Sequence, residues 1–418
     1  MLLQKPAFLL FYHARAAEAS FGEWLGVLWH GLSLDCTVAG YVTAFPVLVA
    51  LASFWIPLSQ RVWRIVLTVY FSLIALVTAA IFAVDLNLYG YWGFRLDGSV
   101  LIYLSDPGEA LASASWGEVL RQILIMLVYA GAMIWSYRWI LRLFRVEPVP
   151  LRGRIVPTVA TLLIGGLTFL AIRGGVTVAT ANVSKVYFSS NMFLNHAATN
   201  PVFSFLSSVG DNENYAEAYP FFEEERRKTL FEELRGNRPG ADAGTPRLLR
   251  SDRPNVVLIL LESFGRTIMD ETVNGEPVMP NMQRFKREGV WFENFFANSF
   301  RTDRGQVAVL CGFPAQTTMS IMKLPRKSAT LPSLARSLGR EGYRSVFMYG
   351  GDLNFTNQAS FMYSTGWEEL IWQKDMQLDA PTSKWGYADD VVVDLFGDEV
   401  EALGRAEQPF LCLLYTSD

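Results

Sequence analysis

Glu262 stands directly after a continuous apolar run, in the stretch "NVVLILLESFG" at 255–265. Such a run of Val, Leu and Ile, ended by Gly265, is typical of a strand covered on both faces in a parallel α/β sheet. Open α/β sheets bind ligands beside the carboxyl ends of their strands, so this carboxylate is well placed to hold a cation. Alternatively, Glu262 and Ser263 only open the next helix, where a negative charge suits the helix dipole.

A second chemical stretch is "NSFRTDRGQVAVLCG" at 298–312. Thr302 and Asp303 can begin a helix, and the amino terminus of a helix attracts anions such as phosphate. Arg301 and Arg304 flank them, and planar guanidinium donors match phosphate oxygens. A hydroxyl between two arginines at a helix start resembles a nucleophile placed for a phosphoryl group. The alternative is an ordinary threonine cap beside two solvated arginines.

The elements that position these residues belong to an α/β domain that begins at about residue 253. Helical runs alternate there with strand-like runs, namely "NVVLILL" at 255, "VWFENFFAN" at 290, "YRSVFMYGG" at 343 and "PFLCLLYT" at 409. Such alternation predicts a mostly parallel sheet with crossover helices. Glu262 and Thr302 lie 40 positions apart. We expect each of them to end a neighbouring strand of one sheet.

The first half of the chain is much more apolar than this domain. The 418 residues are 51% hydrophobic and 14% aromatic, which is high for a wholly soluble protein. Charged loops separate the apolar stretches, which argues against buried helices of a soluble core. Residues 7–12, "AFLLFY", are interpreted as the tail of a helix that begins earlier. We predict a transmembrane helical domain at 1–172, with four to five helices. Its full-length stretches are about 37–58, 65–84, 122–141 and 155–172.

Arginine-rich connections set the predicted orientation, because Lys and Arg accumulate on the cytoplasmic side of a membrane. The acidic connection at 85–120 is placed outside. The chain after about residue 172 is then periplasmic or extracellular. It consists of a juxtamembrane connector at 173–252 and the α/β domain at 253–418. The cytoplasmic arginines are Arg61, Arg64, Arg138, Arg142, Arg145, Arg152 and Arg154.

The juxtamembrane connector holds two recognisable segments. "FFEEERRKTLFEELRG" at 221–236 has apolar residues at helical spacing and predicts a helix on the membrane surface or on the next domain. "GNRPGADAGTPR" at 236–247 is dense in Gly and Pro and predicts a loop.

Together these features resemble the lipoteichoic acid synthase and phosphoglycerol transferase family, membrane-anchored members of the sulfatase and alkaline phosphatase superfamily. The resemblance implies a multi-pass helical domain in a bacterial cell membrane, followed by an extracytoplasmic sulfatase-like α/β domain. It also implies that Glu262 binds a divalent metal, Mn²⁺ or Mg²⁺, and that Thr302 is both metal ligand and nucleophile. The motifs that carry it are "NPVFSF", "NVVLILLESFG", "FRTDRGQVAVLCGFPAQ", "FMYGGDLNFTN" and "WGYADD".

The reaction implied by this resemblance has two steps. Thr302 attacks the head-group phosphate of a phospholipid such as phosphatidylglycerol and releases diacylglycerol. The phosphoglycerol ester then passes to a hydroxyl of a glycan or polyol-phosphate acceptor. Arg304 is a candidate helper for charge that develops on phosphate. A metal would activate the hydroxyl, because no histidine lies near Thr302 in the sequence.

The substrate pocket is expected to use Arg301, Tyr349 and Asp352. The alternative for "YGGD" at 349–352 is a plain turn after a strand. The family as we know it has a His-Gly pair and a Trp-x-Arg motif in this region. Here "YG" at 349–350 and "TNQ" at 356–358 stand instead, which leaves the donor head group open.

The family completes its metal site with an adjacent Asp-His pair nearer the carboxyl end. The histidines of this chain are His13, His30 and His196. We therefore expect a carboxyl-truncated fragment, shortened at the amino end as well, without transferase activity of its own. The final "CLLYTSD" at 412–418 resembles translated library sequence, and we assign it no function.

Two other classes of protein stay open. One is a sulfatase-like phosphodiesterase or hydrolase that uses water as acceptor, although "CGFPA" at 311–315 lacks the arginine of a sulfatase C-x-P-x-R motif. The other is a non-catalytic membrane protein with a degenerate domain. For a transporter we would expect more charged residues within the spans. The net charge of −4 and the lack of a basic stripe give no reason to invoke nucleic acid.

Overall fold

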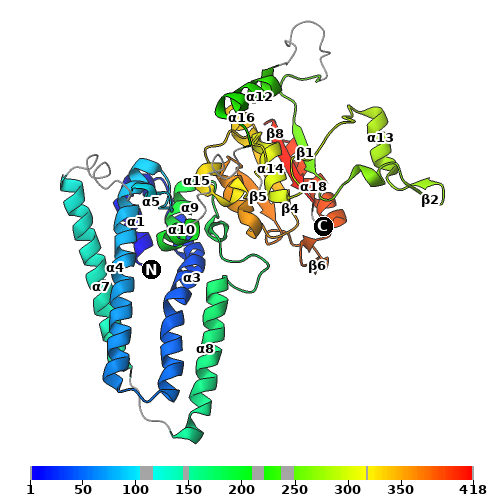
Figure 1. Cartoon of the computed structure of the whole chain (residues 1–418). Coiled ribbons are helices and arrows are strands. Elements are labelled where there is room, and N and C mark those ends of the chain that lie inside the picture. Colours follow the sequence, from blue (N-terminus) through cyan, green and yellow to red (C-terminus); the bar gives the residue numbers. More distant parts are fainter. Residues whose placement is uncertain are drawn as a thin grey trace.

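A computed structural model describes residues 2–103, 116–144, 150–209, 221–236, 249–316 and 319–416. A bundle of long helices forms one part, and an α/β domain sits beyond one end of it (Figure 1). The long helices are α3 (Phe21–Trp55), α4 (Gln60–Trp92), α7 (Trp116–Leu143) and α8 (Ile155–Arg173). All four are long and apolar enough to cross a membrane. The predicted apolar stretches therefore fall on helices of membrane-spanning length.

The helices exceed the predicted apolar stretches. α3 begins at Phe21 rather than near residue 37, because Ser20 caps it in a reciprocal capping box with Glu23. Helix α3 packs along α8, and α4 packs along α7. Many of their remaining apolar side chains are exposed, as expected for helices that face lipid.

Charged residues are buried within this bundle, and they are paired. Lys5 of the short helix α1 (Gln4–Phe11) places its Nζ 2.6 Å from Asp35 Oδ1 of α3. Asn200 Nδ2 donates to the same oxygen at 2.7 Å. Gly31 makes room for this lysine, since a Cβ there would lie 2.0 Å from Lys5 Cε. Residues 7–11 thus belong to a partly buried helix held by an ion pair.

A second buried ion pair joins Asp85 of α4 to Arg95, with 3.2 Å between Oδ2 and Nη2. The backbone N–H of Leu96 also donates to Asp85, at 2.9 Å. Charge inside a membrane helix is tolerated when it is paired and directed into the bundle. The sequence analysis counted few charged residues in the spans and did not foresee this pairing.

The connector packs on the ends of the membrane helices nearest the α/β domain (Figure 1). Its elements are η2 (Val183–Val186), α9 (Met192–Ala198) and α10 (Pro201–Ser208). An asparagine caps each of the three through its side-chain oxygen, which is a strong local signal for a helix start. The predicted helix of the charged segment is α12 (Glu224–Gly236). Phe222 precedes this helix and Phe231 lies within it, and both side chains are exposed. The predicted loop at 236–247 lies almost wholly outside the described residues.

The α/β domain is built on a four-stranded sheet in which every neighbouring pair is parallel. The strand order is β1-β8-β4-β5. The strands are β1 (Val256–Leu260), β8 (Phe410–Tyr415), β4 (Arg344–Tyr349) and β5 (Glu369–Trp372). The predicted parallel sheet with crossover helices is confirmed.

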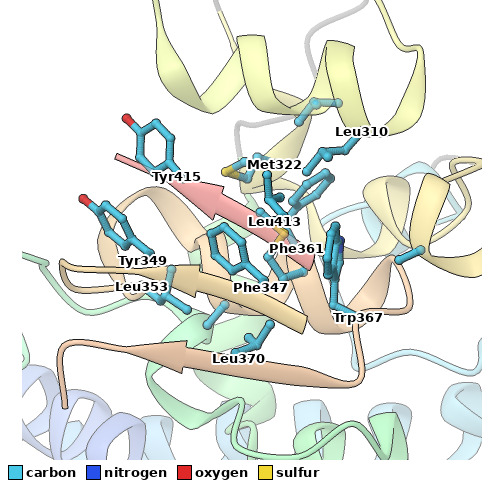
Figure 2. Close-up of a cluster of buried hydrophobic side chains, with 14 of the residues drawn as sticks. Leu310, Met322, Phe347, Tyr349, Leu353, Phe361, Trp367, Leu370, Leu413 and Tyr415 are labelled. Atoms are coloured by element: carbon cyan, nitrogen blue, oxygen red, sulfur yellow. The ribbon is translucent and has the colours of Figure 1, made fainter. Parts of the chain in front are cut away.

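Alternate side chains of these strands enter two apolar clusters, one on each face of the sheet. Phe347 and Leu413 pack with Phe361 and Trp367 on one face (Figure 2). Val346 and Cys412 pack with Phe396 on the other. The covering helices are α14 (Thr302–Cys311), α16 (Leu334–Arg340), α17 (Gln358–Ser364) and α18 (Asp389–Gly404).

The remaining elements are short. They are α2 (His13–Ala16), α5 (Val100–Tyr103), η1 (Leu151–Gly153), η3 (Arg266–Ile268), β2 (Thr272–Val273), β3 (Glu276–Pro277), α13 (Pro280–Glu288), η4 (Ile321–Lys323), α15 (Pro325–Ser328), η5 (Phe355–Asn357), β6 (Thr382–Ser383) and β7 (Gly386–Tyr387).

Two predictions about strands are wrong. β1 is an edge strand, and Val257 and Ile259 are 45% and 48% exposed, so only one of its faces is covered. The segment 290–298 is not a strand. It pairs with no strand of the described residues, and its Phe295 and Phe296 are exposed. An apolar run becomes a strand only when a neighbouring strand completes its hydrogen bonds.

The Lys5–Asp35 pair generates a stability prediction. Asp35→Ala should lower the free energy of unfolding by about 3–5 kcal/mol, because it leaves Lys5 buried without a counter-charge. Thermal melts of the purified chain in neutral detergent would measure this loss. A Lys5→Met/Asp35→Leu double variant should recover most of the stability. A double variant no more stable than Asp35→Ala would show that the pair is not what holds α1 on α3.

Candidate active site

The structure brings Glu262 and Thr302 into direct contact. The Thr302 hydroxyl donates to Glu262 Oε2, with 2.8 Å between the oxygens. Glu262 follows the carboxyl end of β1, and Thr302 is the first residue of α14. Thr302 thus begins a helix, as one reading of the sequence held, and does not end a strand. Ser263, next to the glutamate, has a φ of 58°, a conformation that non-glycine residues adopt mainly at tight turns and functional sites.

Residues at the end of β8 fix the position of this carboxylate. The Glu262 backbone N–H donates to Thr416 Oγ1 at 2.8 Å, and the Thr416 N–H donates to the Leu260 carbonyl at 3.1 Å. The Tyr415 hydroxyl donates to Glu262 Oε2 and lies 3.2 Å from Thr302 Oγ1. The sequence analysis assigned no function to 412–418. The parallel pairing of β8 with β1 brings two of these residues to the site.

Burial and the hydrogen bond to Glu262 raise the pKa of the Tyr415 phenol well above its usual range. The phenol is therefore neutral at ordinary pH. Glu262 thus receives two hydroxyl hydrogen bonds on one oxygen. A hydroxyl that already donates to a carboxylate can pass its proton there as the hydroxyl oxygen attacks an electrophile.

Arg301 and Arg304 flank the threonine in different ways. Arg301 precedes α14 and is half exposed, with its Nε 3.6 Å from Asp303 Oδ1. Arg304 lies in the first turn of the helix and lines a small hollow with Phe313 and Ser320. Both guanidinium groups are thus carried by residues next to the nucleophile candidate.

Asp303 is a buried residue that the sequence analysis named only as a helix starter. Its carboxylate is 3% exposed and lies between Arg301 and Lys323, whose Nζ is 3.9 Å away. Ser320 Oγ also donates to the Asp303 carbonyl at 2.6 Å. The start of α14 is therefore fixed from the side of η4. In the sequence, the signal for this buried ion pairing was the acidic residue flanked by arginines in "RTDR".

Tyr349 and Asp352 lie at the carboxyl end of β4. Tyr349 ends the strand, and its ring centroid is 5.0 Å from that of Tyr415. Figure 2 shows the two rings at the same edge of the sheet. Asp352 Oδ1 accepts from the backbone N–H and from Nδ2 of Asn354, at 2.9 and 2.7 Å. It forms the turn that was the alternative reading of "YGGD".

The described residues do not fit a complete divalent metal site. No group of three or more His, Cys, Asp or Glu side chains that could hold a metal occurs within the described ranges. The pair supplies one carboxylate and a threonine hydroxyl, whereas Mg²⁺ and Mn²⁺ prefer about six oxygen ligands. We therefore derive no chemical step through a metal from these residues.

Comparisons with known proteins found a family match and similar sequences. Residues 254–418 match the Sulfatase family. A phosphoglycerol transferase I of Xanthomonas campestris pv. campestris is 35% identical over 179 residues, which are 40% of this chain and 25% of that protein. One of Salmonella paratyphi B is 28% identical over 173 residues, which are 39% of this chain and 22% of that protein. The matched segment thus spans about a quarter of these relatives.

Solved structures were also compared. An alkaline phosphatase superfamily protein from Vibrio parahaemolyticus shares 30% identity at a TM-score of 0.37 and covers 40% of this chain and 41% of its own. The lipoteichoic acid synthase LtaP from Listeria monocytogenes shares 19% identity at a TM-score of 0.37, over 39% and 40% of the two chains. The family resemblance inferred from the sequence is confirmed by the sequence matches. Members of this superfamily generally depend on metals.

The absence of a complete ligand set among the described residues predicts a weak response to metal. A thermal melt of residues 1–418 with and without millimolar MnCl₂ should give the same midpoint, because two ligand side chains hold a divalent ion poorly. Glu262→Gln is the matched control. A clear upward shift that disappears in Glu262→Gln would show that the site is already complete.

Proposed function

We propose that this chain, whose residues 254–418 form a sulfatase-family domain, is part of a membrane-anchored transferase. It would move a phosphoglycerol-type group from a phospholipid such as phosphatidylglycerol to a hydroxyl of a glycan or polyol-phosphate polymer. The similarity to phosphoglycerol transferases I supports the class of reaction. The hydrogen bond from Thr302 to Glu262 carries the proposal, because it joins a nucleophile to a proton acceptor.

In the proposed reaction the Thr302 oxygen attacks the phosphorus of the donor lipid. Its proton passes to Glu262 Oε2, 2.8 Å away. The bond from phosphorus to the diacylglycerol oxygen breaks, and that oxygen leaves as an alcohol after taking the proton from Glu262. In the second step an acceptor hydroxyl attacks the phosphorus of the phosphothreonine ester and gives its proton to Glu262. The bond from phosphorus to the Thr302 oxygen breaks, and that oxygen takes the proton back.

The start of α14 is suited to the negative charge of the phosphate. The N–H groups of a first helical turn point outward and attract anions. Arg301 directly precedes Thr302, and its half-exposed guanidinium can reach a ligand. Arg304, in the first turn of the same helix, is the second proposed cation. Tyr349 is proposed as a wall of the substrate pocket. Asp352 is the weaker candidate, because its carboxylate is already used within a turn.

The proposed cofactor is a divalent metal, Mn²⁺ or Mg²⁺, with Glu262 and Thr302 among its ligands. The resemblance to the superfamily supports it. Its remaining ligands would come from outside the described residues, since those residues complete no site. The chemistry that such an ion supplies is stabilisation of negative charge on the phosphate and the attacking oxygen.

The proposed location is a bacterial cell membrane, with the α/β domain in the periplasm or outside the cell. In Figure 1 this domain lies at the ends of the helices opposite the turn between α3 and α4. That turn leads into Arg61 and Arg64, Arg142 lies in the last turn of α7, and Arg154 directly precedes α8. Positive charge on these two connections favours placing them in the cytoplasm.

A fusion test checks this orientation. A reporter that is active only in the cytoplasm, fused after residue 250, should stay silent, because the preceding helix leaves the membrane outward. The same reporter fused after residue 59, between α3 and α4, should be active and serves as the control. Activity after residue 250 with silence after residue 59 would reverse the whole assignment.

Product analysis tests the reaction. The natural protein that contains this chain in full should release diacylglycerol from labelled phosphatidylglycerol and place the label on a glycan or polymer. Thr302→Ala should lower the rate by roughly 10⁴-fold or more, as deletion of a nucleophile does in other enzymes. Thr302→Ser should keep measurable transfer, because it retains a hydroxyl.

Ser299→Ala is the matched control, since Ser299 lies three positions earlier and holds the Arg301 N–H. Free glycerol phosphate as the main product would mean that water is the acceptor and that the protein is a hydrolase. Full turnover in Thr302→Ala would contradict a covalent ester on Thr302. No turnover of any phospholipid would favour a non-catalytic membrane protein.

A further inference from the structure

A cavity of about 790 Å³ lies where the helix bundle meets the α/β domain. Three separate segments line it. They are the turn after α4 (94–99), residues 178–208 of the connector, and the segments 323–330 and 355–357 of the α/β domain. The cavity is therefore built by the junction itself, at the outer ends of the predicted membrane spans.

One wall of the cavity is basic. Lys323, Arg326 and Lys327 belong to η4 and α15 of the α/β domain. Arg326 already has partners in the helix bundle. Its Nη1 lies 3.2 Å from Asp97 Oδ1, and its guanidinium carbon lies 4.1 Å from the ring centroid of Trp92. The two lysines are exposed at the cavity wall. Their ammonium groups suit an anionic ligand.

Buried polar atoms without a partner among the described residues belong to other residues of the lining. They are His196 Nε2, Asn357 Oδ1, and Nε and Nη1 of Arg95. These side chains are only 4%, 8% and 2% exposed. A buried polar atom without a hydrogen bond is costly, so a ligand or water that pairs with it is favoured.

His196 is a neutral hydrogen-bonding group here. Burial, with Arg95 and Arg15 nearby, lowers its pKa to about 3. Its Nδ1 lies 3.1 Å from the Tyr89 hydroxyl, which leaves Nε2 for another partner. Asn357 Oδ1 is an acceptor only. The cavity thus combines cations with neutral groups, one of which requires a donor such as a hydroxyl.

The cavity wall is also connected to the candidate active site. Lys323 lies 3.9 Å from Asp303, the residue after Thr302. Ser320, which caps η4, donates to the Asp303 carbonyl at 2.6 Å. The basic wall and the start of α14 therefore form one packed unit.

We propose that this junction cavity binds the polyol-phosphate head group of a phospholipid before the group reaches Thr302. The phosphate would face Lys323 and Lys327, and a hydroxyl of the polyol would donate to Asn357. A head group is favoured over a free polyol phosphate, because Trp92 ends α4 and Phe94 of the cavity lining follows it, which places the cavity at the outer end of a predicted span, the level of lipid head groups. The choice of a donor lipid rests on the proposed transferase function.

A lipid titration of the purified chain 1–418 in neutral detergent tests the cavity directly. Native mass spectrometry would compare dihexanoyl phosphatidylglycerol with dihexanoyl phosphatidylcholine, and with glycerol 1-phosphate that carries no acyl chain. We expect phosphatidylglycerol to bind about tenfold more tightly than phosphatidylcholine, because it alone offers two hydroxyls without a compensating cation. Free glycerol 1-phosphate should bind more weakly than the lipid.

Two variants locate the binding. Lys327→Gln removes one exposed cation, and Asn357→Asp places a negative charge in the cavity while keeping a residue type that tolerates its φ of 65°. Each should weaken phosphatidylglycerol binding about tenfold, as loss of a charge-assisted hydrogen bond does. Lys228→Gln, at an exposed lysine of α12, is the matched control and should bind as the wild type does. Unchanged melting midpoints verify folding.

Equal binding of the two lipids, or unchanged binding by both cavity variants, would overturn the proposal. Glycerol 1-phosphate that binds as tightly as the lipid would overturn the lipid source and point to an acceptor polymer. Thr302→Ala separates this proposal from the transferase function, because it should leave binding intact. Lipid binding without turnover by the natural protein would contradict only the proposed transferase function. Turnover without lipid binding in the cavity would contradict only the proposed binding site.

Discussion

The hydrogen bond between the Thr302 hydroxyl and the Glu262 carboxylate is the contact on which the functional account depends. Without it, Thr302 would be an ordinary first residue of a helix, and Glu262 a charge at the edge of a sheet. The bond exists because β1 ends at the edge of the domain where α14 begins, with 2.8 Å between the two side-chain oxygens. The β1–β8 pairing fixes the position of the Glu262 carboxylate, and the contacts of Asp303 fix the start of α14. The proposed attacking oxygen is thereby held against its proposed proton acceptor before any substrate binds.

The rest of the structure holds this pair at a defined place relative to the membrane helices. Arg326 of the α/β domain reaches Asp97 and Ser99 after α4. Asn182 of the connector donates to the Asn354 carbonyl at 2.7 Å, and Ser184 Oγ accepts from the Ser360 N–H at 3.0 Å. The connector is in turn joined to the bundle, because Asn200 shares the Asp35 carboxylate with Lys5. Polar contacts thus run from the buried ion pair of the bundle to the loops beside the candidate active site. For the proposed donor, a membrane lipid, such positioning would be useful.

The parts that were predicted from the sequence are those with a local cause. The apolar run before Glu262 indicates a strand, and "RTDRG" indicates a helix start, so both candidate site residues were singled out from their neighbours. The long apolar helices follow from composition in the same way. What failed depends on distant partners. The coverage of β1 depends on its place at the sheet edge, and the segment 290–298 lacks a neighbouring strand within the described residues. The burial of Lys5 depends on Gly31 and Asp35, and the junction cavity needs three segments that are far apart in the chain.

The most direct test of the central claim is a search for the covalent intermediate. The natural protein that contains this chain would be incubated with phosphatidylglycerol labelled in its head group, without acceptor, and its peptides would be analysed by mass spectrometry. The account predicts a phosphoglycerol group on the peptide that contains Thr302, formed together with diacylglycerol, and no such group in Thr302→Ala. Release of diacylglycerol with the label on another residue, or with no labelled residue, would contradict it.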